Sequence, residues 1–510
     1  MGEHDRPSPS APPGRLRAHR ALIDTYQQPV VYLRGDSPVC RAEGFEAQAQ
    51  VELTANGLSV PAILHRVGAG WLAPDEAGLS DAAWSLLGLQ GGEEVSVRHA
   101  TPLESLKFLR AKVYGRRLDY PSLRALIEDV SRGRVADLHL AAFVTACAGG
   151  RLDEAEIVAL TRAMVDVGER IRWPLAPVMD KHCVGGLPGN RTTLIAVPIV
   201  AACGVVMPKT SSRAITSPAG TADAMETLAP VNLDVAAMRR VVEGEGACIA
   251  WGGAAQLSPA DDVLIRVERP LDLDSEAQLV ASVLSKKLAA GAERVVIDLP
   301  VGPTAKVRSR ASAQSLAASL TAVGAAIGLQ VRVIETDGSQ PVGRGIGPAL
   351  EAMDAMAVLQ RQADAPRDLR ERALALAAAV LEMAGRAAPG GGLALAARTL
   401  DSGQALAKFL AICKAQGGLR EPPRAPYREV VAAPSSGRVG AIDNRRLARA
   451  AKLAGAPHDA AAGLVIHLRI GESVTAGQPL FTLHAQTPGE LAYALAYVRA
   501  QAPIIAIDPS

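Results

Sequence analysis

The sequence predicts a multidomain α/β protein. Its expected parts are a small β-rich N-terminal domain, a helical domain, a large α/β domain with a mixed or parallel sheet, and a C-terminal α+β domain. Its 510 residues allow about three to four domains of ordinary size. A hydrophobic fraction of 49% against 21% charged residues is enough to fill large cores. Along the chain the hydrophobic pattern changes from strand-like runs to helical spacing, and then to an alternation of the two.

The composition argues against several kinds of partner. A net charge of +2 and only 3% aromatic residues are unlike a protein that binds nucleic acid through a basic patch or an aromatic stacking surface. No apolar run reaches the roughly 20 residues of a membrane span, and the polar N-terminus has no apolar signal segment. We therefore expect a cytoplasmic protein with small-molecule substrates, no nucleic acid partner and no membrane partner.

The cysteines are scattered and form no C-x-x-C pair, so their spacing is neither that of a zinc site nor that of a secreted disulfide framework. This pattern fits a reducing cytoplasm, and no metal site is evident. The six are Cys40, Cys147, Cys183, Cys203, Cys248 and Cys413.

The N-terminal region divides into a tail and a domain. Residues 1–20 are rich in proline, serine and charge, which predicts a flexible tail. In residues 21–100, short β-branched runs between glycine and asparagine breaks predict a β-rich domain. This segment carries no catalytic cluster, so we favour a structural or assembly role for it.

A helical domain is expected over residues 101–170, with a return of the chain to it near 258–290. Leu123, Leu126 and Val130 recur at helical spacing. Asp153 and Glu156 form a capping-box pattern at the start of a later helix.

An α/β domain is predicted from residues 171–257 and 291–423, where short β-branched runs alternate with helical segments. Residues 424–510 predict an α+β domain, and a turn-rich hairpin at 471–480 resembles the barrel-sandwich fold of biotinyl and lipoyl carriers. Such carriers need an exposed lysine at a hairpin tip. This segment offers none, so a structural domain is the better interpretation.

A glycine-rich motif, DKHCVGGLPGNRTT at residues 180–193, precedes a long apolar run. Glycines allow backbone N–H groups to converge, and hydroxyl residues are typical caps of a helix start. A helix start attracts anions, and Lys181 adds a full positive charge. The motif therefore predicts a phosphate site beside the ionisable His182. Alone, so short a glycine motif is more often an ordinary tight loop.

Two further stretches could complete such a site. Residues 208–223 follow a predicted strand and combine six hydroxyl side chains with a lysine and an arginine, which suits an anion. On the predicted helix in 274–287, Ser282 and Lys286 are four residues apart and share a face. Each stretch alone could be an ordinary solvated loop or helix. Together they favour a binding site.

In this order and spacing, the three motifs resemble those of the thymidine phosphorylase family of nucleoside phosphorylases. They are most similar to its longer branch, the type 2 thymidine phosphorylases, which is close to the AMP phosphorylases. The likeness spans roughly residues 100–500. It implies phosphorolysis: inorganic phosphate, as co-substrate and with no cofactor, attacks the anomeric carbon of a nucleoside while the base leaves. It also implies a homodimer or a larger homo-oligomer.

The resemblance assigns roles to individual residues. Lys181, His182 and Asp274 are implied to be catalytic, with Asp274 as proton donor to the leaving base in the AMP phosphorylase pattern. His182, Ser282 and Lys286 match base-contacting positions. The implied phosphate-contacting residues are Lys181, Cys183, Thr193, Ser211 and Thr221. The positions that match nucleotide contacts are Gly186, Ser212, Arg213, Ala214, Ile215, Thr216, Ser217, Thr221, Ser282 and Lys306.

The chain also departs from the short family members. Cys183 stands where they have a serine, an extra residue lies within 187–189, and their base-binding arginine has no clean match, with Arg266 nearest. These differences lean toward the AMP phosphorylase pattern. Thymidine as substrate, giving thymine and 2-deoxy-D-ribose 1-phosphate, is therefore weighed against a nucleoside 5′-monophosphate such as AMP, CMP or UMP, giving ribose 1,5-bisphosphate. A non-catalytic nucleotide-binding or assembly protein with the same fold is the alternative outside enzymes.

Overall fold

The computed structural model describes residues 15–68, 70–189, 191–214, 217–255, 257–271, 273, 275–501 and 503–509. The chain packs as two compact units. The first consists of Met1–Tyr114 and Asp129–Phe143, and the second of Gly115–Glu128 and Val144–Ser510. The segment predicted as one helical domain is thus divided between the two.

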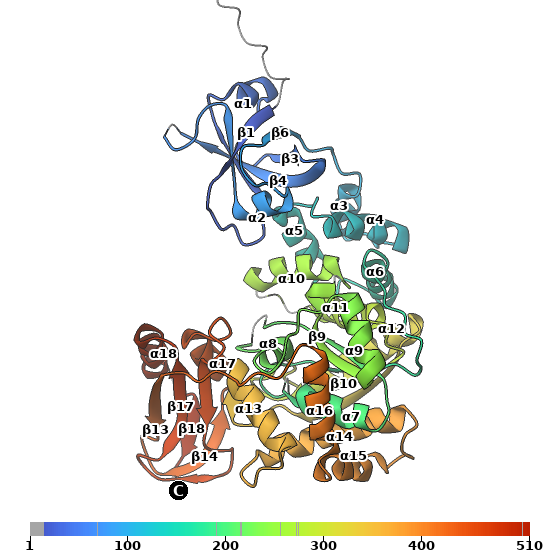
Figure 1. The fold of residues 1–510 in the computed structure, drawn as a ribbon, viewed down its shortest axis with the longest axis vertical. Coiled ribbons are helices and arrows are strands. Elements are labelled where there is room, and N and C mark those ends of the chain that lie inside the picture. Colours follow the sequence, from blue (N-terminus) through green and yellow to red (C-terminus); the bar gives the residue numbers. More distant parts are fainter. Residues whose placement is uncertain are drawn as a thin grey trace, which may run out of the picture. The chain divides into compact units, whose positions relative to one another are not determined.

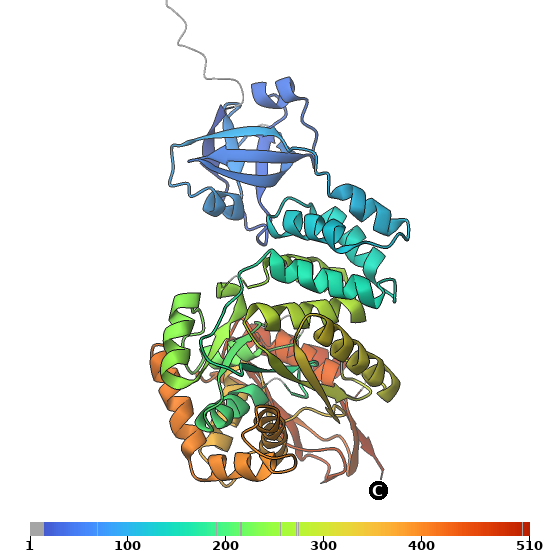
Figure 2. The ribbon, with the colours of Figure 1, turned by 90° about the vertical axis from the view of Figure 1, so that its right-hand side faces the viewer.

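The first unit contains a closed six-stranded barrel, shown in blue in Figures 1 and 2. Its strands follow the order β1-β5-β2-β4-β3-β6, and the pairs β1–β5 and β2–β4 are parallel. Alternate side chains fill it, as Val51 and Leu53 do on β3. The strands are β1 (Arg15–Arg20), β2 (Val30–Arg34), β3 (Gln50–Ala55), β4 (Leu58–Val67), β5 (Glu76–Leu79) and β6 (Glu94–His99). Two short helices, α1 (Pro38–Glu43) and α2 (Asp81–Leu86), accompany them.

The prediction of a flexible tail over residues 1–20 is wrong for its last six residues. Arg15–Arg20 form β1, which pairs with β5 and β6. The sequence pattern did not reveal this strand because its residues are mostly polar. Only one side of the strand is buried, at Leu16. The earlier residues, 1–14, lie outside the described part of the chain.

The helical segment contains α3 (Leu106–Val113), α4 (Tyr120–Ser131), α5 (Asp137–Cys147) and α6 (Glu154–Asp166). The apolar face predicted from Leu123, Leu126 and Val130 is confirmed, because all three lie on α4 and are fully buried. The capping box at the start of α6 is also present: Asp153 accepts from the Glu156 N–H, and Glu156 accepts from the Asp153 N–H. Later in the chain, α11 (Glu276–Ala289) packs along α6, and α10 (Pro259–Leu271) touches it.

The α/β part is built from parallel strand pairs. β7 (Met179–Cys183), β10 (Arg294–Val301) and β11 (Gln330–Asp337) form one sheet, and β8 (Met207–Ser211) and β9 (Ala247–Trp251) form another. A parallel bridge between Val178 and Val206 joins the two. The surrounding helices are α7 (Thr192–Ala202), α8 (Thr221–Glu226), α9 (Val235–Glu245), α12 (Arg310–Ala326), α13 (Pro348–Leu359), α14 (Arg367–Met383), α15 (Gly392–Asp401) and α16 (Gln404–Ala415).

Helix α7 is the centre of this part. Its residues 192–201 are all buried, which is typical of a helix that is apolar on every side and enclosed by its neighbours. It packs against α14 and α16 and contacts β8 and β9. Because the glycine-rich motif leads directly into α7, the largest hydrophobic core holds the start of this helix in place.

The C-terminal part holds two sheets, with α17 (Asn444–Leu453) and α18 (Pro488–Ala500) at one end (Figure 1). One sheet has the order β12-β15-β17-β13 and the other β16-β14-β18. The strands are β12 (Gly345–Ile346), β13 (Tyr427–Ala432), β14 (Gly437–Ile442), β15 (Gly463–Ile466), β16 (Ser473–Val474), β17 (Pro479–Ala485) and β18 (Ile505–Asp508).

Two details of the sequence prediction need correction here. The stretch at 471–480 is no hairpin, because β16 pairs with β14 whereas β17 pairs with β13 and β15. The C-terminal sheet also begins before residue 424, since Gly345 and Ile346 form its edge strand β12. Both differences arise from pairing between distant segments, which local patterns do not reveal.

Candidate active site

The glycine-rich motif runs from the end of β7 to the start of α7. Gly186 has φ +60°, a left-handed conformation that glycine adopts without strain. Residue 190 lies outside the described residues. The prediction that the hydroxyl residues cap the helix is wrong: Arg191 holds the cap position, and Thr192 is the first helical residue, its Oγ1 donating to the Gly189 carbonyl at 2.6 Å. The hydroxyls instead face the lysine of the motif.

Lys181 lies at this helix start with no solvent exposure. Its Nζ donates to Thr192 Oγ1 at 2.6 Å and to Thr193 Oγ1 at 3.3 Å. Burial lowers the pKa of Lys181, because an ammonium group that is removed from water is less stable. A cation and the positive end of a helix are thus brought together, which is an arrangement suited to an anion.

Asp180 connects the three motifs. Its Oδ1 accepts from the Lys181 N–H at 2.6 Å and lies 3.3 Å from Lys209 Nζ, and its Oδ2 lies 2.9 Å from Lys287 Nζ. Burial alone would raise the pKa of Asp180, but Lys209 and Lys287 hold it below its ordinary value. Lys209 lies on β8 and Lys287 on α11, so this carboxylate ties both elements to β7.

His182 faces a strongly positive environment. The pKa of His182 lies well below its usual value. Burial is the main cause, and the positive charges of the neighbouring lysines, above all Lys287 and Lys209, lower it further. The ring is therefore neutral at neutral pH. In that form it has one N–H donor and one acceptor nitrogen to offer a substrate.

Cys183 lies against the buried carboxylate of Asp298, its register partner on β10. Burial, and then the charge of Asp298, raise the pKa of the Cys183 thiol well above its ordinary value. Asp298 itself accepts from Thr336 Oγ1 at 2.6 Å, and Arg372 Nη1 lies 4.0 Å away. Cys183 is thus a protonated thiol, a weak hydrogen-bond donor rather than a nucleophile.

Gly189 closes the motif around this pair. A Cβ added at Gly189 would lie 2.4 Å from Cys183 Sγ and 2.8 Å from Asp298 Oδ2. If this loop binds phosphate, as the sequence predicts, Gly189→Ala should displace it and raise KM for phosphate by about tenfold or more, a loss of about 1.4 kcal/mol of binding. The matched control is Gly244→Ala, in helix α9, where an added Cβ meets no atom within 4 Å. Steady-state kinetics of both variants test this, and an unchanged KM in Gly189→Ala would contradict it.

The second motif forms a loop between β8 and α8. The Asp223 carboxylate accepts from the N–H groups of Ala214 and Gly220, at 2.6 and 2.9 Å. Ser217 Oγ donates to the Ala219 carbonyl. A Cβ added at Gly186 would lie 3.8 Å from Ser217 Cβ, so this loop and the glycine-rich motif are neighbours.

Several predicted residues can be placed in this loop. Ser211 ends β8, Ser212 follows it, and Thr221 begins α8. Residues Ile215 and Thr216 lie outside the described part of the chain.

The Arg213 side chain is held by protein groups. Its Nη2 lies 3.0 Å from Glu226 Oε1 and its Nη1 lies 3.3 Å from Asp223 Oδ1. Its guanidinium also lies over the Trp251 ring, 4.9 Å from the centroid. Hydrogen bonding to Glu226 raises the pKa of Arg213. These contacts hold the Arg213 side chain and partly neutralise the cation that the sequence offered for an anion.

The third motif lies on α11. Ser282 and Lys286 are both partly exposed and share one face, one turn apart. Lys286 Nζ lies 2.5 Å from Asp261 Oδ2, on α10. Asp274, the implied proton donor, lies outside the described residues. Lys306 is exposed on the segment that follows β10.

A buried arginine supports the loop from behind. Arg191 has no solvent exposure, and its guanidinium lies 3.4 Å from both Glu351 and Asp354 and donates to the Gly345 carbonyl. Burial raises the pKa of Glu351 to about 7. Arg191 thereby links the glycine-rich motif to α13 and β12.

Sequence reasoning assigned no role to four charged residues of this site. Asp180 and Lys287 stand inside the motifs, next to residues that were chosen. Lys209 is the lysine that the sequence offered for an anion, but its pairing with Asp180 was not predicted. Asp261 and Asp298 left no signal, since their roles arise only from contacts across the fold.

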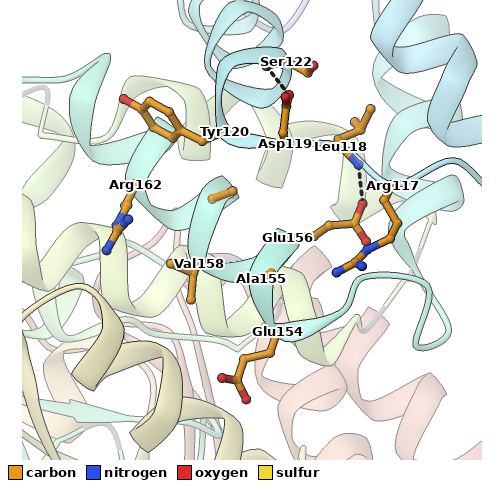
Figure 3. Close-up of a pocket in the computed structure, with 11 residues that line it drawn as sticks. Arg117, Leu118, Asp119, Tyr120, Ser122, Glu154, Ala155, Glu156, Val158 and Arg162 are labelled. Carbon is orange, nitrogen blue, oxygen red and sulfur yellow. Dashed lines mark hydrogen bonds between the residues drawn. The ribbon is translucent and has the colours of Figure 1, made fainter.

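A surface groove of about 740 Å³ lies elsewhere, between the start of α4 and α6 (Figure 3). Two of its carboxylates are engaged: Glu156 accepts from the Leu118 N–H, and Asp119 accepts from the Ser122 N–H. Within the described residues, no three His, Cys, Asp or Glu side chains gather as a metal site. The described helices include none with the length and apolar character needed to cross a membrane.

Comparison with known proteins identifies three family domains in the chain. Residues 106–168 match the glycosyl transferase family helical bundle domain, and residues 175–406 match the glycosyl transferase family a/b domain. Residues 438–505 match the pyrimidine nucleoside phosphorylase C-terminal domain. The predicted multidomain architecture of helical, α/β and C-terminal parts is confirmed at this level.

A solved structure and several whole-length relatives are similar to the chain. Anthranilate phosphoribosyltransferase from Thermus thermophilus has a TM-score of 0.51 at 21% identity, covering 61% of this chain and 99% of its own, and thus shares the fold. "Putative thymidine phosphorylase 2" of Acidovorax sp. (strain JS42) is 66% identical over 97% of this chain and 96% of its own. A relative from Polaromonas sp. (strain JS666), named "Putative thymidine phosphorylase", is 64% identical over 98% of each. The chain therefore belongs to the thymidine phosphorylase family and is an enzyme of the pentosyltransferase type.

Proposed function

We propose that this enzyme cleaves a pyrimidine nucleoside with phosphate, converting thymidine to thymine and 2-deoxy-D-ribose 1-phosphate. The observation that supports this most is the buried lysine cluster at the start of α7. Burial lowers the pKa of Lys181, and that of Lys209 well below its ordinary value, because ammonium groups removed from water are destabilised. The negative charge of a phosphate bound there would stabilise these ammonium groups. Inorganic phosphate is the only co-substrate in this proposal, with no metal and no cofactor.

The reaction follows from two opposed sets of groups. Phosphate, held by Lys181 and the α7 start, attacks C1′ of the sugar as the bond from C1′ to N1 of thymine breaks. The electron pair of that bond goes to the base, which becomes negatively charged and then takes up a proton. In this proposal, His182, Ser282 and Lys286 contact the base. Hydrogen-bond donors that already point to where negative charge develops stabilise the transition state and so lower the barrier.

Charge favours a nucleoside over a nucleotide. Lys181 and the ion-paired Lys209, Lys286, Lys287 and Arg372 face Asp180, Asp261 and Asp298, which leaves two formal positive charges. Inorganic phosphate alone brings about −1.5 to −2 charges at neutral pH, as phosphate monoesters do. A second phosphate on the substrate would need a further cation, and Arg213 is already paired with carboxylates. The names of the relatives agree with this choice.

The test is phosphate-dependent release of free base from thymidine, uridine, AMP and CMP, run in parallel. We expect release from thymidine. Release from the monophosphates alone would replace this function by nucleoside 5′-monophosphate phosphorolysis, with Lys306 and the Ser212–Ser217 loop as candidates to hold the 5′-phosphate. In that case Lys306→Ala should raise KM for the monophosphate. No release from any of the four would contradict both.

A further inference from the structure

Two neighbouring lysines on α11 have different surroundings. Successive residues of a helix point about 100° apart, so Lys286 and Lys287 face different groups. Lys287 is buried and pairs with Asp180 at 2.9 Å. The Lys286 side chain keeps 23% of its surface exposed, and its Nζ lies 2.5 Å from Asp261 Oδ2. The more open of the two cations is therefore paired with Asp261.

Asp261 is unlike a partner in an ordinary surface ion pair. Its side chain is only 2% exposed, and a buried carboxylate is strongly destabilised unless a cation or hydrogen bonds compensate it. It lies in the first turn of α10, where the helix dipole favours a negative charge. The carboxylate is thus fixed by its surroundings, whereas the long, partly exposed lysine side chain is the adjustable partner.

The same contact keeps Lys286 charged. Burial alone would lower the pKa of Lys286, but the charge of Asp261 and its hydrogen bond raise it above the ordinary value. The ammonium group lies on the α11 face that also carries Ser282, one turn away. A cation held on this face would meet negative charge as it develops on a leaving base.

We propose that Asp261 is a positioning residue for nucleobase recognition, holding the Lys286 ammonium on the Ser282 face of α11 where the base leaves. This inference rests on the proposed function. Without Asp261, the flexible lysine stem would sample other directions, and the base would lose a preorganised donor. The alternative is a purely structural tie between α10 and α11, which would affect the fold irrespective of Lys286.

A double-mutant cycle separates these roles. We expect Asp261→Asn to raise KM for thymidine by about tenfold, or about 1.4 kcal/mol, while KM for phosphate stays within about twofold. Lys286→Met should have at least this effect. The double variant should be no worse than Lys286→Met alone, because Asp261 acts through that lysine. The control is Glu243→Gln, at an exposed position of α9, which should behave as the wild type. Additive effects, or an equal rise in KM for phosphate, would overturn the proposal.

A conservative variant covers the case in which Asp261→Asn does not fold. Asp261→Glu keeps the charge but moves it outward by one methylene. It is expected to raise KM for thymidine, with KM for phosphate unaffected. An unchanged KM for thymidine in Asp261→Glu would overturn the positioning role.

A binding measurement distinguishes failure of this inference from failure of the proposed function. If the wild type releases no base from thymidine, the proposed function fails. Calorimetry of free thymine binding, in the presence of phosphate, is then compared across the same variants. Weaker binding in Asp261→Asn and Lys286→Met, with no further loss in the double variant, would support the positioning role without turnover. Equal thymine binding in all variants, or none by the wild type, would overturn it.

Discussion

Replacing Lys181 by methionine is expected to lower kcat/KM for phosphorolysis by about 10³-fold, the loss typical of removing one charged or hydrogen-bonding group that stabilises a transition state. Lys181 is fully buried, and its ammonium donates to Thr192 and Thr193 at the start of α7. Methionine has nearly the same length and no charge, so the core should remain filled while the proposed phosphate site loses its cation. Circular dichroism and steady-state kinetics with varied phosphate measure the two effects.

A lysine elsewhere in the same unit provides the control for this prediction. Lys408 on α16 pairs with Glu245 at 2.9 Å at a partly exposed position. Lys408→Met should keep wild-type turnover. Activity of Lys181→Met within about tenfold of the wild type would contradict the role given to the buried cation, since that loss is only about 1.4 kcal/mol.

Replacing Asp180 by asparagine is expected to destabilise the chain by about 3–5 kcal/mol, the usual cost of removing one partner of a buried ion pair. Lys209 and Lys287 would lose their common carboxylate in a site from which water is largely excluded. Urea unfolding followed by tryptophan fluorescence measures the loss. Adding Lys287→Met should restore part of it, because the surplus buried charge is then removed.

The control for this second prediction is a carboxylate at the protein surface. Glu335 on β11 lies 3.9 Å from Arg310, which is 85% exposed. Glu335→Gln should change the unfolding free energy by less than about 1 kcal/mol, as exposed ion pairs do. A similarly small change in Asp180→Asn would show that the cluster is not what holds β7, β8 and α11 together.

Features that depend on neighbouring residues could be predicted from the sequence alone. The buried stripe of α4, the capping box at Asp153 and Glu156, and the glycine turn before α7 follow from residue type and spacing. Three motifs in the right order were enough to indicate the family and the class of reaction. The position of Lys181 beside a helix start could also be predicted, because the lysine, the glycine turn and the helix are close in sequence.

Other features were decided by tertiary structure. Arg15–Arg20 became a barrel strand, and Gly345–Ile346 joined the C-terminal sheet, because strand pairing joins segments distant in sequence. Arg213, which suggested an anion ligand, is instead paired with Asp223 and Glu226. The choice of partner for each charge depends on which elements the core brings within about 4 Å, the range over which charges in a low dielectric interact most strongly.

The lysines of the site show this division most clearly. The sequence by itself indicated that Lys181 lies beside a glycine-rich turn and hydroxyl residues, and that Lys286 shares a helix face with Ser282. Only the fold determined that Asp180 forms an ion pair with Lys287, and Asp261 with Lys286. The physical reason is that residue type sets which charges are available, whereas burial and distance set which of them must be compensated and by which partner.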